Sequence, residues 1–248
     1  MGERDADEGV DGGYLAESRT FAMAAVSILP LMLVYHWGII QSGYGERNLA
    51  QVWLEGPLQV VGLHAAHLLN VALAIALLAV LWRSGKARSF SLFTVVGIVG
   101  EATFYAALLY KGAPALAALL DKRASSLAFA VHWRAHAPLC LALGAGVYEE
   151  LFFRLLMVGG GTLLLSKVFM WDRWLSLAVM LLVSSLLFAA AHYVGPLGER
   201  FESYSFLYRA VCGMLLGVVF LTRGLGVAVW THAIYNALVL AQQAAHGA

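Results

Sequence analysis

The sequence predicts an all-α fold, a polytopic bundle of about seven or eight transmembrane helices with an interfacial amphipathic helix. Of its 248 residues, 61% are hydrophobic and 12% are charged, whereas soluble domains are roughly 45–50% apolar and about 25% charged. The mean hydropathy is +0.76, and the apolar residues gather in stretches of about the 20 residues that a helix needs to cross a bilayer. A surface of this composition is compatible with lipid and not with water.

Most of the chain divides into apolar stretches that are expected to cross the membrane. These stretches lie near 20–42, 58–82, 92–110, 137–165, 174–194, 207–222 and 226–244. The segment 111–136 mixes lysine and arginine with leucine and phenylalanine, which is typical of an amphipathic helix in the membrane interface. Residues 1–19 are expected to form a disordered acidic tail, and residues 20–248 a single transmembrane helical domain, because no internal repeat divides them.

Charge and cysteine content exclude several kinds of partner. The net charge is only +1 and no long basic run is present, so nucleic acid is not an expected partner. Cys140 and Cys212 lie in separate apolar segments, without the paired spacing of a metal clip or a disulfide framework. The expected partners are membrane lipids and a membrane-associated protein or peptide, and the expected location is a bacterial-type inner (plasma) membrane, which the chain crosses several times.

Four ionisable residues lie inside predicted spans, where each costs about 2.5–3.5 kcal/mol on insertion scales. They are Glu101, Glu149, Glu150 and Arg154. Glu150 and Arg154 are four residues apart and share a helical face, so they can form an ion pair that leaves the Glu149 carboxylate available. A structural polar knot that joins helices is the alternative.

Two later spans add imidazole and amide groups at helical spacing. One contains Phe188 and His192, and the other contains His232 and Asn236, each pair four residues apart. Singly, each histidine is more often a hydrogen-bonded core residue than a catalyst. Together with Glu149, they supply a carboxylate base, two imidazoles and an amide, the groups needed to activate water and stabilise an oxyanion in amide hydrolysis.

The depths of the two histidines conflict in a simple bundle. His192 lies near the end of one predicted span and His232 near the start of another, so two parallel spans of full length would place them at opposite depths. We therefore expect helix ends that stop inside the protein, a span that continues past Gly195 and Pro196, or span boundaries that differ from the predicted ones.

The three patterns resemble the CAAX-protease and bacteriocin-processing (CPBP or Abi) family of intramembrane proteases. The family pattern is E-E-x-x-x-R, then F-x-x-x-H, then H-x-x-x-N. This sequence matches it in order, with all three motifs inside residues 137–244: Glu149-Glu150-Leu-Phe-Phe-Arg154, Phe188-Ala-Ala-Ala-His192 and His232-Ala-Ile-Tyr-Asn236.

The resemblance implies an intramembrane endopeptidase, a hydrolase that cuts a peptide bond of a membrane-associated substrate. It implies that Glu149 and His192 activate the water and that His232 and Asn236 support the oxyanion. It also implies that Glu150 and Arg154 hold the geometry of the site or help to polarise it.

Metal-free and zinc-dependent chemistry are both compatible with these residues. Glu149, His192 and His232 could hold Zn²⁺ with a water in the fourth position. A glutamate base with an amide-lined oxyanion hole uses no cofactor, and Asn236 beside His232 favours this second reading.

Two other classes of function use the same residues. A proton-coupled membrane transporter would relay protons through them, and a non-catalytic membrane chaperone or immunity protein would retain them for stability alone.

Glu101, with Tyr105 four residues later, is expected to be a protonated carboxyl bonded to a neighbouring helix, or else to line the substrate cavity. His64 and His67 lack the glutamate of a zinc-protease helix and are expected to have a packing or interfacial role.

Overall fold

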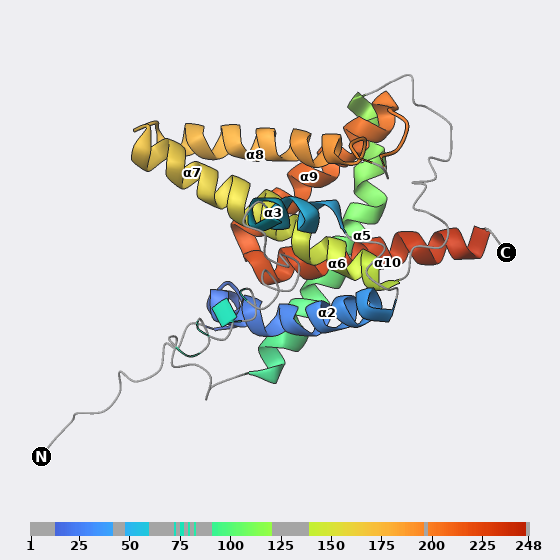
Figure 1. The fold of residues 1–248 in the computed structure, drawn as a ribbon, viewed down its shortest axis with the longest axis horizontal. Helices are drawn as coiled ribbons and strands as arrows, with labels where there is room; N and C mark the ends of the chain where they lie inside the picture. Colours follow the sequence, from blue (N-terminus) through green and yellow to red (C-terminus); the bar gives the residue numbers. More distant parts are fainter. Residues whose placement is uncertain are drawn as a thin grey trace, which may run out of the picture.

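The computed structural model describes residues 13–41, 48–59, 91–120, 139–195 and 198–246, with a few single positions between 72 and 82. Every regular element in these ranges is a helix (Figure 1). In chain order the helices are α1 (Tyr14–Glu17), α2 (Phe21–Gln41), α3 (Leu49–Gln59), α5 (Leu92–Leu120), α6 (Leu139–Glu149), η3 (Glu150–Gly160), α7 (Gly161–Leu163), η4 (Leu164–Val168), α8 (Arg173–Ala191), α9 (Ser203–Arg223) and α10 (Leu225–His246).

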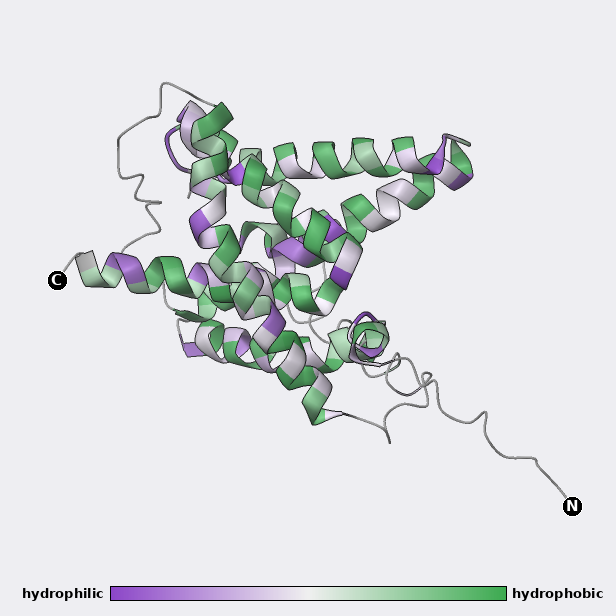
Figure 2. Ribbon diagram, turned by 180° about the vertical axis from the view of Figure 1, so that it is seen from behind, coloured by the Kyte–Doolittle hydropathy of each residue, from purple (hydrophilic) through white to green (hydrophobic). Residues whose placement is uncertain are grey.

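The helical membrane bundle predicted from the sequence is confirmed. Within the described residues, 6 helices are long and apolar enough to cross a membrane, the run from Leu139 to Val168 counting as one. Figure 2 shows hydrophobic residues over most of the helix surfaces and polar residues in the middle of the molecule. The chain is therefore an integral, multi-pass membrane protein. The expected span 58–82 lies almost wholly outside the described residues.

Two predicted boundaries differ from the structure. Residues 111–120 were expected in an interfacial helix, but they continue α5, which runs for 29 residues through Pro114. The remainder of that expected helix, 121–136, lies outside the described residues. Residues 13–19 were expected in a disordered tail, but they contain α1, whose Tyr14 hydroxyl donates a 2.6 Å hydrogen bond to Glu101. A local sequence pattern could not predict this contact, because its partner lies on a distant helix.

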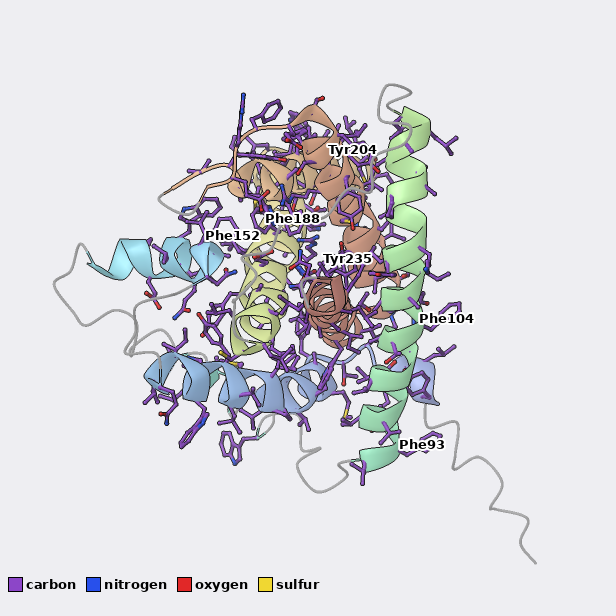
Figure 3. The ribbon with its side chains drawn as sticks, turned by 90° about the vertical axis from the view of Figure 1, so that its right-hand side faces the viewer. Phe93, Phe104, Phe152, Phe188, Tyr204 and Tyr235 are labelled. Atoms are coloured by element: carbon purple, nitrogen blue, oxygen red, sulfur yellow. The ribbon has the colours of Figure 1, made fainter. Side chains whose placement is uncertain are left out.

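Helix α10 lies at the centre of the bundle. It packs against α2, α5, α6 and α9, and Figure 3 shows it nearly end-on between α5 and the helix formed by α6 and η3. A Cβ atom added to Gly146 of α6 would lie 2.8 Å from the backbone nitrogen of Ala233 in α10. The two backbones therefore approach as closely as glycine permits, and this approach brings the end of α6 against the residues around position 232.

Replacing Gly146 with leucine should separate α6 from α10. Overpacking of this kind costs about 1–3 kcal/mol, and each kcal/mol lowers the unfolding temperature by about 2–4 °C in a protein of this size. Thermal unfolding of the purified protein in detergent measures the effect. The matched control is Gly100→Leu in α5, where an added Cβ meets nothing within 4 Å. Equal unfolding temperatures for the two variants would contradict the close packing.

Candidate active site

The helix that carries the first motif changes its winding at the two glutamates. Glu149 is the last residue of α6, and Glu150 begins a π-helical segment that extends to Gly160. The backbone stays in the right-handed helical region at this junction, with φ −70° and ψ −37° at Glu149, so the helix does not break. π-helical turns are rare and occur frequently at functional sites.

Glu150 is the fully buried carboxylate at the centre of the site, with 0% of its side chain exposed. Its Oε2 lies 3.1 Å from Nε of Arg154, so the ion pair predicted from their spacing is present. Its Oε1 lies 2.7 Å from Nδ1 of His232 in α10. A carboxylate only accepts hydrogen bonds, so Nδ1 carries the proton here. Nε2, at the opposite edge of the ring, takes no part in this contact.

Arg154 connects the pair to α8 and α9. Its Nη2 donates a 3.2 Å hydrogen bond to the backbone oxygen of Gly213, and its guanidinium carbon lies 4.6 Å from the centre of the Phe188 ring. This distance is typical of a cation–π contact. Nη1 of Arg154 is buried and has no hydrogen-bond partner among the described residues. The guanidinium is thus held mainly by one carboxylate, one carbonyl and one aromatic face.

Glu149 takes no part in the Arg154 pair and is the more accessible of the two glutamates, with 14% of its side chain exposed. Its Oε1 accepts a 2.8 Å hydrogen bond from Nδ2 of Asn48. Its Oε2 lies 3.8 Å from Nε2 of His232. This gap is too long for a direct hydrogen bond and suits a bridging water molecule. The imidazole of His232 is therefore held between the two carboxylates.

The Phe188 ring contacts both histidines of the later motifs. Its centre lies 5.2 Å from that of His192 and 5.8 Å from that of His232, and Figure 3 shows Phe188 in the interior between the helices. Helix α8 ends at Ala191 and His192 follows in a turn. The helix thus stops at the site and does not continue to Gly195. His192 and His232 nevertheless converge on the Phe188 ring, as the site requires.

His192 is oriented by the backbone of its own helix. Its Nδ1 lies 2.9 Å from the carbonyl oxygen of Phe188, so Nδ1 donates and Nε2 is the free ring nitrogen. The residue lies just beyond the end of α8. Burial lowers the pKa of His192, an effect that the charge of Glu149 opposes. The neutral imidazole is therefore favoured, with Nε2 able to accept a proton.

Asn236 lies one turn beyond His232 in α10. It is 2% exposed, and its Nδ2 donates a 3.1 Å hydrogen bond to the backbone oxygen of Ala142 in α6. One of its two amide N–H groups is thereby engaged and the other remains. The structure therefore brings Arg154 and both histidines around the Phe188 ring. Both carboxylates lie against His232, and Asn236 is on the adjoining turn.

Helix α3 adds two residues that the sequence analysis did not select. Asn48, at its start, contacts Glu149, and the ring of Trp53 lies 5.5 Å from that of Phe152 in the first motif. An asparagine directly before a helix is a common N-cap, and this signal could have located the start of α3. No local pattern could have indicated its contact with Glu149.

Glu101 belongs to a second polar cluster, away from these residues. Its carboxylate pairs with Nε and Nη2 of Arg223, the second contact at 2.8 Å, and accepts from the Tyr14 hydroxyl. Burial and the neighbouring Glu101 carboxylate raise the pKa of Tyr14 to about 12. The expected bond between Glu101 and a neighbouring helix is present. It is an ion pair with Arg223, whereas a protonated carboxyl was expected. His64 and His67 lie outside the described residues.

The described residues do not gather into a metal site. No group of three or more His, Cys, Asp or Glu side chains among them is arranged to hold a metal ion. Glu149 Oε1 is bonded to Asn48 and His232 Nδ1 to Glu150, so each residue offers one atom to the space between them.

Comparison with known proteins agrees with the motifs. A family model described as type II CAAX prenyl endopeptidase Rce1-like matches residues 131–238. No curated protein and no solved structure matches the chain. The matched segment contains all six predicted site residues, so the resemblance to the CAAX-type intramembrane proteases is confirmed over this part of the chain.

Removal of the Arg154 guanidinium should destabilise the protein through Glu150. Arg154→Ala leaves a fully buried carboxylate without its cation, a change that costs about 3–5 kcal/mol in buried pairs. Thermal unfolding in detergent should show the loss, and the exposed Arg173 at the start of α8 provides the control Arg173→Ala. An Arg154→Ala protein as stable as this control would show that the pair does not hold the site together.

Proposed function

We propose that this membrane protein is an intramembrane endopeptidase that hydrolyses a peptide bond of a membrane-associated protein or peptide. The observation that carries the proposal is the 3.8 Å gap between Oε2 of Glu149 and Nε2 of His232. A base and a potential hydrogen-bond donor lie close enough there for one water molecule beside them to hydrogen-bond to both. The match of residues 131–238 to a protease family supports the same conclusion.

Glu149 acts as the general base in this proposal. Oε2, the oxygen that Asn48 does not hold, takes a proton from the bridging water while the water oxygen attacks the carbonyl carbon of the substrate. His192, whose Nδ1 is engaged by the Phe188 carbonyl, helps through Nε2 to hold and polarise the water in this proposal. When the tetrahedral intermediate collapses, the C–N bond breaks and Glu149 returns the proton to the leaving amine nitrogen.

His232 and Asn236 stabilise the oxyanion. Glu150 accepts the Nδ1 proton of His232 and so fixes the ring with Nε2 toward the substrate, where it supports the developing negative oxygen. The Asn236 amide donates the N–H that Ala142 does not use. Arg154 supplies the positive charge that balances the buried Glu150 carboxylate.

The family description indicates which substrate to test first. The matching family is described as a prenyl endopeptidase of the CAAX type, so a prenylated C-terminal peptide is the first probe to use. Leader peptides and C-terminal sorting signals are the other probes, because a membrane-embedded site reaches any peptide that the lipid anchors nearby. We place the reaction at a bacterial-type plasma membrane.

Replacement of Glu149 by glutamine should abolish cleavage. The amide cannot take a proton from water, so the rate should fall by at least about 100-fold, while the protein remains folded and inserted. The assay follows a fluorescent farnesylated CAAX peptide, a leader peptide and a sorting-signal peptide in proteoliposomes. Asp172→Asn, an exposed change at the start of α8, is the control with unchanged activity. Cleavage by Glu149→Gln at the wild-type rate, or cleavage of no probe by the wild type, would refute the proposal.

A further inference from the structure

The start of α3 places an amide against the catalytic carboxylate. Nδ2 of Asn48 donates to Oε1 of Glu149 at 2.8 Å, across 101 positions of sequence. The other end of the same amide, Oδ1, accepts a 2.8 Å hydrogen bond from the backbone nitrogen of Ala50. Both ends of the amide are therefore engaged, and its orientation follows from its two partners.

The helix behind Asn48 is anchored to α2 by the buried Tyr35 hydroxyl. The Tyr35 hydroxyl donates to Oε1 of Gln51, and Nε2 of Gln51 donates to Oε1 of Glu55 at 2.6 Å. Tyr35, Gln51 and Glu55 are all buried. The backbone nitrogen of Asn48 also lies 3.4 Å from the Tyr35 hydroxyl. Buried, hydrogen-bonded groups of this kind fix the position of a helix, so Asn48 is presented to Glu149 from a fixed support.

The contact controls which carboxylate oxygen faces the site. The last torsion of a glutamate side chain is broad and roughly two-fold, so a single ion pair does not define the plane of the carboxylate. Glu149 faces Nε2 of His232 from α10 at 3.8 Å, and its charge also acts on His192 and Arg154. None of these three contacts is a hydrogen bond to Glu149, whereas the contact with Asn48 is.

We infer that Asn48 is a positioning residue: it holds Oε1 of Glu149 and thereby turns Oε2 toward Nε2 of His232, where the attacking water binds. This inference rests on the proposed function. It adds to the site a residue from the N-terminal half of the chain, outside the segment 131–238 that matches the protease family. Both ends of the Asn48 amide are engaged, by Glu149 and by Ala50, so its effect passes through Glu149.

Asn48→Ser separates positioning from helix capping. Serine caps a helix about as well as asparagine, but its hydroxyl is too short to reach Glu149. The expected result is a fall in the kcat of the folded protein of about 10 to 100-fold, with KM unchanged. Asn48→Asp also keeps the cap and should lower kcat further, because it faces Glu149 with a like charge. Asp172→Asn exchanges the same groups at the cap of α8, where Asp172 accepts from Leu175, and should leave kcat unchanged.

A wild-type kcat for Asn48→Ser, or a raised KM with an unchanged kcat, would overturn the inference. A purely structural role would instead lower the unfolding temperature of Asn48→Ser and leave the kcat of the folded fraction unchanged, and this result would overturn it as well.

A double-mutant cycle tests the contact without an activity assay. Asn48→Asp alone should lower the unfolding temperature by about 2–4 °C through like-charge repulsion. In the Glu149→Gln background the donor and acceptor exchange places, so the same change should cost little. Equal losses in both backgrounds would overturn the inference.

If the wild type cleaves no probe but the cycle shows coupling, the proposed function fails and the contact stands. If the wild type cleaves but no coupling appears, the inference alone fails.

Discussion

A buried carboxylate that must be neutralised organises this structure. Glu150 is fully buried, and an isolated charge in such a place is too costly to persist. Its two oxygens lie against Arg154 on its own helix and His232 on α10. Arg154 extends the connection to the Gly213 carbonyl in α9 and the Phe188 ring in α8. One charge thus joins η3, α8 and α10, which carry residues of the three motifs, to α9.

The same constraint leaves Glu149 available for chemistry. Because Glu150 takes the arginine and one imidazole nitrogen, Glu149 faces the second imidazole nitrogen across a gap that water can fill. The Glu101 and Arg223 pair shows the contrast. There the carboxylate pairs closely with the guanidinium and accepts a tyrosine hydroxyl as well. A purely structural role, the alternative considered for the charged residues of the first motif, fits the Glu101 cluster better than it fits Glu149.

Helical spacing predicted the contacts within single helices and failed for contacts between them. The Glu150 and Arg154 pair and the shared face of His232 and Asn236 follow from residues four apart. The contact between His232 and Glu150 depends on the close approach at Gly146, and the contact between Asn48 and Glu149 depends on where α3 lies. Neither is encoded in a local pattern, because packing between distant segments decides both. The same reason explains why Arg223 was not foreseen as the partner of Glu101.

The central claim is that Glu149 and His232 hold a water molecule between them while Glu150 holds the ring. An experimental structure of the wild-type protein at a resolution that shows ordered water tests it most directly. The account predicts a water at a hydrogen-bond distance of about 2.7–3.0 Å from both Glu149 Oε2 and His232 Nε2, with Nδ1 on Glu150. A Glu149 side chain turned away from His232, or a His232 ring separated from Glu150, would contradict it.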